Sequence, residues 1–201
     1  MAPIYPLYIR DAQGNIMTDS RGFTMYDYGD AKGLSGYKYK RNFMGGSNPA
    51  SSGQLDKNSY VADVFSGRWS AEVNLYDGLK FTYNLGLDID NTVQSVLYNA
   101  FYGQYSSQGG VVQKQTERTS AINNQQLLTY VHDFGKHNID LLLGHETYKW
   151  KDTGLWGSKN KLYNPGIIEI DNAILSPQTG SSSDEYSTEG WLARAQYSYD
   201  D

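Results

Sequence analysis

The dipeptide His145-Glu146 is the nearest approach to a catalytic motif in this chain, because His-Glu begins the H-E-x-x-H motif of zinc peptidases. That motif needs a second histidine one helical turn later, so that both imidazoles reach the same metal ion. The residues that follow are Thr147–Lys149, and the local pattern is that of a strand. His132 and His137 occupy a strand and a turn and offer no converging set of ligands. We therefore expect no metal site and no cofactor.

Other signatures of catalysis or ion binding are incomplete. Asp88–Asn91 is rich in side-chain oxygens, but it lacks the glycine and the distal glutamate of an EF-hand loop. The sequence contains no G-x-S-x-G, P-loop or G-x-G-x-x-G pattern, and the absence of cysteine excludes thiolate catalysis. We interpret Asp88–Asn91 as the solvated end of a strand and expect that the protein is not an enzyme.

Aromatic side chains give the only indication of a ligand. Flat aromatic faces can stack on sugar rings, and a tyrosine hydroxyl can bind polar groups. The alternative is that these side chains pack on one another, or lie near a membrane interface where tyrosine is common. The candidate substrate-binding residues are one cluster within eight positions and two tryptophans near another connection: Tyr98, Phe101, Tyr102, Tyr105, Trp150 and Trp156.

The elements that must position these residues are strands. In Leu79–Asp90 every odd position is apolar and every even position is polar or glycine, which gives a strand one apolar and one polar face. Twelve alternating residues exceed the usual strand length of about five or six and match the roughly 9–11 residues that a tilted strand needs to cross a bilayer. Four more segments are predicted as strands: 65–76, 124–134, 138–149 and 190–199. The 124–134 segment is less regular, with Leu127 and Leu128 on opposite faces.

The predicted connections alternate between short and long. Asp77-Gly78 and Gly135–His137 are short turns, whereas 91–123 and 150–189 are long connections. This alternation is typical of outer-membrane barrels, which have short periplasmic turns and longer outer loops. The predicted fold class is therefore all-β: an antiparallel meander of long strands with long loops, forming a section of a large transmembrane β-barrel.

Composition agrees with this fold and excludes one class of partner. The 201 residues include 18 Tyr and 21 Gly but only 5 Pro, which suits strands, turns and interfacial aromatic residues. The net charge is -5, from 17 Lys+Arg against 22 Asp+Glu, so we expect no binding to nucleic acid. Met1–Pro3 begins neither a basic stretch nor an apolar run, so the chain is either cytoplasmic or an internal piece of a longer protein. Five strands cannot close a membrane barrel, and we therefore expect an internal piece.

Several short motifs, taken in order, resemble those of SusC/RagA-type TonB-dependent transporters, which are outer-membrane proteins that import glycans or peptides. The resemblance covers nearly the whole chain. The matching stretches are Tyr5–Tyr8, Asp27–Gly29, Asn48-Pro49 leading to Leu55, Gly78–Phe81, Leu127–Gly144 with its Phe134–His137 turn, Gly144–Glu146 and Tyr197–Asp201.

The resemblance implies a middle section of a barrel of about 22 strands with a plugged lumen, in the outer membrane of a Gram-negative cell. Residues 1–59 would be a loop-rich extracellular segment, and 60–201 a partial barrel of about five strands with two long outer loops. The implied partners are a SusD-like surface lipoprotein, an oligosaccharide or peptide substrate, and membrane lipid. The TonB complex would act through N-terminal parts that this chain does not contain.

Two other hypotheses remain open. A soluble extracellular β-domain that binds carbohydrate would bury Leu79, Phe81, Leu85 and Leu87 between two sheets. A small eight-stranded membrane barrel would need three further strands, for which the first sixty residues show no pattern.

Overall fold

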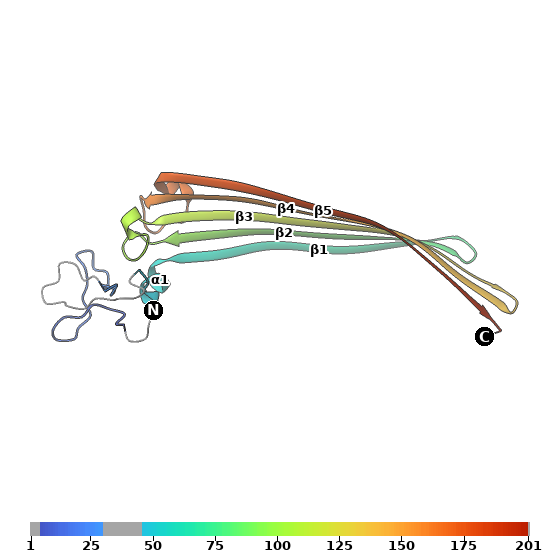
Figure 1. Cartoon of the computed structure of the whole chain (residues 1–201), viewed down its shortest axis with the longest axis horizontal. Coiled ribbons are helices and arrows are strands. Elements are labelled where there is room, and N and C mark those ends of the chain that lie inside the picture. Colours follow the sequence, from blue (N-terminus) through green and yellow to red (C-terminus); the bar gives the residue numbers. More distant parts are fainter. Residues whose placement is uncertain (1–4, 30–45, 201) are drawn as a thin grey trace. The chain divides into compact units, whose positions relative to one another are not determined.

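The computed structural model describes residues 5–29 and 46–200. Residues 1–4 and 30–45 of the predicted loop-rich segment, and Asp201 of the last matching motif, lie outside the described residues. One five-stranded sheet with the order β1-β2-β3-β4-β5 dominates the fold, so neighbouring strands in the sheet are also neighbours in sequence (Figure 1). The strands are β1 (Lys57–Tyr76), β2 (Leu79–Tyr98), β3 (Val111–Phe134), β4 (His137–Leu162) and β5 (Ala173–Tyr199).

The predicted antiparallel meander is confirmed, and two-residue turns join the strands that were expected to form hairpins. Asp77-Gly78 connects β1 to β2, and Gly135-Lys136 connects β3 to β4. Gly78 and Gly135 have φ angles of 75° and 71°, a conformation that glycine adopts without the steric cost of a Cβ atom. His137, predicted to belong to the turn, is the first residue of β4.

The strands are longer than their alternation patterns predict. The two long connections expected at 91–123 and 150–189 shorten to 99–110 and 163–172, because β2, β3, β4 and β5 all continue into them. In these continuations apolar residues do not alternate regularly with polar ones, as in Gln113–Thr119. A strand whose two faces meet similar surroundings needs no alternation, so periodicity detects only the stretch with unlike faces.

A short helix precedes the sheet. Helix α1 (Pro49–Leu55) begins after Asn48, whose side chain accepts hydrogen bonds from the backbone N–H groups of Ala50 and Ser51. Asn followed by Pro at the first helical position is a favourable start for a helix. None of the helices among the described residues is long and apolar enough to cross a membrane.

The chain forms two compact units. The loop unit comprises Met1–Tyr60, Gln94–Gln115 and Trp156–Gly180, and the sheet unit comprises Val61–Val93, Thr116–Leu155 and Ser181–Asp201. The buried apolar side chains of the described residues all belong to the loop unit: Ile9, Tyr26, Leu97, Val112 and Ala173. In the described part of the sheet unit, only Thr82, Gly86 and Gly144 are buried. The described part of the sheet unit therefore has no apolar core of its own.

Candidate functional site

The loop unit begins with a repeated turn. Asp11–Gly14 and Asp19–Gly22 share the pattern D-x-x-G, eight residues apart, and both glycines have positive φ angles. Each aspartate accepts backbone N–H hydrogen bonds from the residues two and four positions later. The segments between the turns are joined by a closed ring of hydrogen bonds: Met17 N to Ile9 O, Ile9 N to Met25 O, and Met25 N to Met17 O.

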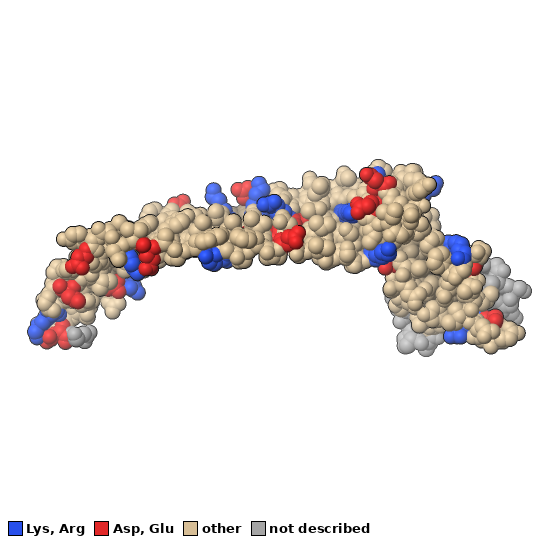
Figure 2. All heavy atoms as spheres, turned by 180° about the vertical axis from the view of Figure 1, so that it is seen from behind, with Lys and Arg blue, Asp and Glu red and all other residues tan. Residues whose placement is uncertain are grey.

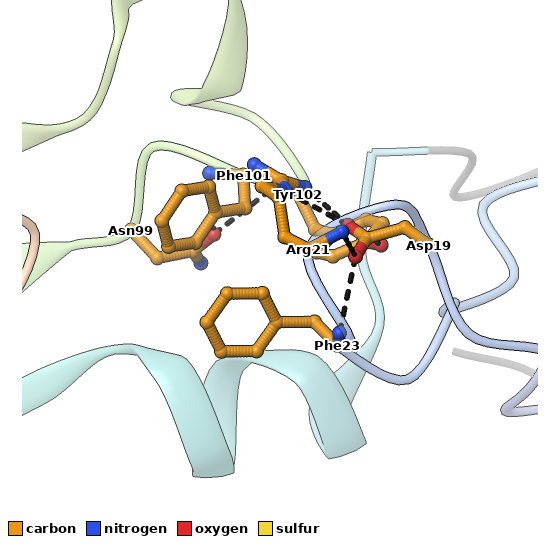
Figure 3. Close-up of polar contacts among 6 residues, drawn as sticks. All are labelled: Asp19, Arg21, Phe23, Asn99, Phe101 and Tyr102. Atoms are coloured by element: carbon orange, nitrogen blue, oxygen red, sulfur yellow. Dashed lines mark hydrogen bonds and ion pairs between the residues drawn. The ribbon is translucent and has the colours of Figure 1, made fainter.

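The second turn attaches to the connection between β2 and β3 through Asp19. Its carboxylate accepts hydrogen bonds from the Arg21 guanidinium and from the Tyr102 hydroxyl, the latter at 3.1 Å (Figure 3). Arg21 lies 4.3 Å from the centroid of the Phe101 ring, which in turn stacks on Phe23. We call Asp19, Arg21, Phe23, Phe101 and Tyr102 the anchor cluster.

Hydrogen bonding and burial together set the pKa values in the anchor cluster. The Arg21 guanidinium is the largest of the causes that lower the pKa of Asp19 from 3.8 to about 2. Burial, followed by the hydrogen bond to Asp19, raises the pKa of Tyr102, so the Tyr102 hydroxyl keeps its proton and donates it.

We expect acid to loosen the anchor cluster. Because the pKa of Asp19 is lower in the folded protein than in the unfolded chain, ionised Asp19 stabilises the fold above about pH 4. That contribution is lost as the pH falls through the folded value of about 2. Hydrogen exchange of residues 17–25, corrected for intrinsic rates, should show protection falling over this range in the wild type.

Two substitutions separate this effect from general acid unfolding. Asp19→Asn should lower protection of residues 17–25 at neutral pH and remove much of the pH dependence. Asp11→Asn changes the equivalent turn, whose carboxylate accepts hydrogen bonds within its own turn, from Asn15, and should leave the acid transition of the cluster in place. Equal pH profiles for the wild type and Asp19→Asn would contradict the assignment.

A cavity of about 150 Å³ lies in the loop unit and is lined by four tyrosines. The rings of Tyr98 and Tyr105 are 4.4 Å apart, and Tyr102 stacks on Tyr28 with a centroid distance of 6.4 Å. The remaining lining residues come from the segment before α1, from α1 and its C-cap, and from the connection after β2: Gly46, Ser47, Ser52, Asp56, Asn99, Gly103 and Gln104. We call this the tyrosine cavity.

Asn99 holds the β2–β3 connection in the shape that forms the cavity. Its side-chain oxygen accepts hydrogen bonds from the backbone N–H groups of Phe101 and Tyr102, so the aromatic residues follow a tight local turn. Its own backbone N–H and its side-chain amide both donate to Oδ1 of Asp56, at 2.8 and 2.6 Å. Asp56 thereby ties the end of α1 to the end of β2.

The structure brings together some of the six aromatic residues that were singled out from the sequence. Tyr98, Tyr102 and Tyr105 line the tyrosine cavity, whereas Phe101 packs in the anchor cluster. Trp150 lies in the sheet unit beside Leu87 and Ile122. Trp156 lies in the loop unit over Gly180, where an added Cβ would come within 2.6 Å of the indole ring. Contact between these side chains and a substrate stays a prediction.

Sequence reasoning missed Tyr28, Asn99 and Asp56 as parts of the cavity. The Asn48-Pro49 dipeptide is a signal for the start of a helix. It could have drawn attention to Asp56, which is the C-cap of that helix. The D-x-x-G repeat that forms the two turns is also visible in the sequence. No local pattern indicates that Tyr28 meets Tyr102, because the two are far apart in sequence.

The sheet unit carries unlike faces, as the alternation predicts. On one face, charged residues of neighbouring strands form the pairs Arg68–Asp88, Lys80–Glu72 and Arg194–Asp140. Over the strands, Figure 2 shows Lys and Arg beside Asp and Glu in small mixed groups on a largely uncharged surface. These pairs are exposed to solvent, so each contributes little to stability, but they favour one register of the strands.

The opposite face of the sheet unit is apolar and lacks a cover among the described residues. A shallow groove on this face is lined mainly by Leu79, Leu128, Leu141, Leu143, Ala193 and Ala195. Leu141 and Leu143 keep 41% and 49% of their surface exposed. Leu127 lies on the charged face, where it contacts the position of Gly144, which confirms that Leu127 and Leu128 point to opposite sides.

His145 belongs to the apolar face, and its neighbours do not make a metal site. Its ring nitrogens lie 2.7 Å from Oε1 of Gln126 and 2.8 Å from Oε1 of Glu189, and its ring packs on Trp191. No group of three or more potential ligands that could hold a metal ion occurs among residues 5–29 and 46–200. Asp88, considered above for calcium, lies inside β2 and does not end a strand. Its carboxylate pairs with Arg68 of β1.

Comparison with known proteins finds similar folds among solved structures only. No protein-family model and no curated protein matches the sequence. Among solved structures, the RagAB peptide transporter matches with a TM-score of 0.71 and 16% identity, over 81% of this chain and 19% of that chain. The RagAB peptide importer in its "closed-closed" and "open-open" states gives TM-scores of 0.67, with 17% and 18% identity over 73% and 77% of this chain.

The matches confirm, at the level of the fold, the resemblance to RagA-type transporters found in the sequence. The chain spans only 17–19% of the length of the matched chains, so it has the fold of one section of such a protein.

Proposed function

We propose that the chain forms part of the wall of an outer-membrane transporter of SusC/RagA type, which imports glycans or peptides without making or breaking covalent bonds. The observation that carries this proposal is the uncovered apolar face of the sheet unit, opposite a face with cross-strand ion pairs. A membrane barrel needs this arrangement, because its outer face contacts hydrocarbon and its inner face contacts water.

Strand length supports a membrane position for part of the sheet only. The strands contain 20–27 residues, about twice the 9–11 that a tilted strand needs to cross a bilayer. The regular apolar alternation begins at the two-residue turns, which we assign to the periplasmic side. The cell surface then holds the two longer connections, 99–110 and 163–172, together with the segment 1–59. Residues 60–201 form the partial barrel.

The proposed partners follow from this orientation. A SusD-like surface lipoprotein would cover the outer connections, and the TonB complex would supply energy from the periplasm. The matched structures, of the RagAB peptide transporter and peptide importer, support transport as the role of the whole protein. The tyrosine cavity would lie on the same side as the lipoprotein and the arriving substrate.

The proposal is tested with the full-length gene product in a Gram-negative host. We expect it in the outer-membrane fraction, with gel migration that changes on heating, and we expect uptake of a labelled peptide or oligosaccharide mixture that stops when TonB is deleted. A matched host that lacks the gene controls for background uptake. Recovery of a monodisperse protein without detergent would overturn the proposal and favour the alternative of a soluble carbohydrate-binding domain.

A further inference from the structure

The charge on the described wall of the tyrosine cavity is negative. Among the described residues that line it, Asp56 is the only charged one, and none is a lysine or an arginine. Arg21, the cation of the neighbouring anchor cluster, is paired with Asp19. The charge on the described part of its wall is therefore negative, which favours a positively charged or neutral guest over an anion.

Asp56 retains capacity to bind a donor. The hydrogen bonds that its carboxylate accepts from the backbone and the side chain of Asn99 both end on Oδ1. Among the described residues Oδ2 has no hydrogen-bond partner. A carboxylate with one oxygen occupied can still accept a charge-assisted hydrogen bond on the other.

The remaining walls suit a cation as well. The faces of Tyr28, Tyr98, Tyr102 and Tyr105 carry the negative part of the ring quadrupole, which attracts ammonium groups. A cavity of about 150 Å³ has room for a group of the size of benzene, and so for an ammonium group with a few attached carbons. One carboxylate with aromatic neighbours is a poor site for a metal ion, which needs several converging ligands.

We infer that the tyrosine cavity binds an organic ammonium group, either the N-terminus or a lysine side chain of a peptide. The inference deepens the proposed function and rests on it for the idea that the guest is part of the transported cargo. Binding does not depend on transport, however, and can be measured by itself. The ammonium group would donate to Asp56 while its attached carbons contact the tyrosine rings.

Calorimetry on the purified full-length protein in detergent tests the inference. The probes are trialanine, which has a free ammonium group, N-acetyl-trialanine, which lacks that charge, and maltotriose as a neutral sugar. We expect the wild type to bind trialanine at least about tenfold more tightly than N-acetyl-trialanine. This is the ratio of affinities that one charge-assisted hydrogen bond produces. Equal affinities, no binding of trialanine at millimolar concentration, or tighter binding of maltotriose would overturn the inference.

Substitutions test whether binding of the ammonium group depends on Asp56. Asp56→Asn keeps an oxygen that can accept from Asn99 but removes the charge, and should weaken trialanine binding about tenfold or more. Asp184→Asn makes the same change on exposed β5 and should leave binding unchanged. If Asp56→Asn does not fold, Tyr105→Leu removes one aromatic wall and should weaken trialanine more than N-acetyl-trialanine. Undiminished binding in a folded variant would overturn the inference.

The outcomes also separate the cavity from the transport proposal. Ammonium-selective binding that needs Asp56, in a protein without TonB-dependent uptake, would support the cavity and overturn the proposed function. TonB-dependent uptake in a protein whose binding depends neither on the ammonium group nor on Asp56 would support the proposed function and overturn the inference about the cavity.

Discussion

Leu141→Arg is expected to destabilise the protein in a lipid bilayer by about 2–4 kcal/mol, the cost of a cation on the lipid face of a barrel near the bilayer midplane. Leu141 lines the groove of the apolar face and is 41% exposed there. Its neighbour Asp140 pairs with Arg194 on the other face, and alternation of side chains places Leu141 opposite to that pair. The guanidinium would therefore meet hydrocarbon.

Leu192→Arg is the matched control. Leu192 is 40% exposed, almost the same as Leu141, but it lies two residues from Arg194 and contacts the position of Gly144 on the charged face. Water would solvate an arginine there, so we expect a cost below about 1 kcal/mol. Reversible urea unfolding of the full-length protein in lipid vesicles gives both values. Similar costs for the two variants would show that the apolar face does not contact lipid.

The strands near the turns could be predicted because two strong signals coincide there. Alternation in Leu79–Asp90 follows from unlike surroundings on the two faces, and Asp77-Gly78 supplies the residues that a tight turn demands. The register agrees with the same alternation, since the cross-strand pairs Arg68–Asp88 and Lys80–Glu72 all join even-numbered positions of β1 and β2.

The distant halves of the strands could not be predicted by the same means. From Val111 to Thr119, β3 carries polar residues on both faces, and periodicity gives no signal when neither face is distinctly apolar. Their strand conformation depends on hydrogen bonding to neighbours, such as that of Thr119 to Asp152, which a local pattern does not contain. Long connections were therefore predicted where the structure has paired strands.

The candidate site was predictable in composition but not in arrangement. Tyr98, Tyr102 and Tyr105 lie close in sequence, and a local cluster can be recognised as one. Their arrangement around a cavity depends on Asp56, which holds Asn99, and on Tyr28, which stacks on Tyr102. Those contacts join residues more than forty positions apart, as the separation of Asp56 and Asn99 shows.

Gly78→Ala should have the second large effect, because the backbone of another strand blocks the space beside this turn. A Cβ atom at residue 78 would lie 2.2 Å from the carbonyl oxygen of Val131, whose N–H donates to the carbonyl of Gly78 itself. Alanine would also have to adopt a φ angle of 75°. Backbone strain and overpacking together predict a cost of about 2–5 kcal/mol.

Gly135→Ala isolates the backbone contribution, since Gly135 has nearly the same φ angle, 71°, but no atom within 4 Å of an added Cβ. We expect it to cost only about 1–2 kcal/mol, the penalty of a left-handed conformation for a residue with a side chain. Urea unfolding in vesicles measures both variants under the same conditions. A Gly78→Ala cost no greater than that of Gly135→Ala would mean that the β1–β2 turn does not rest on β3, and the register of the meander at this end would have to be reassigned.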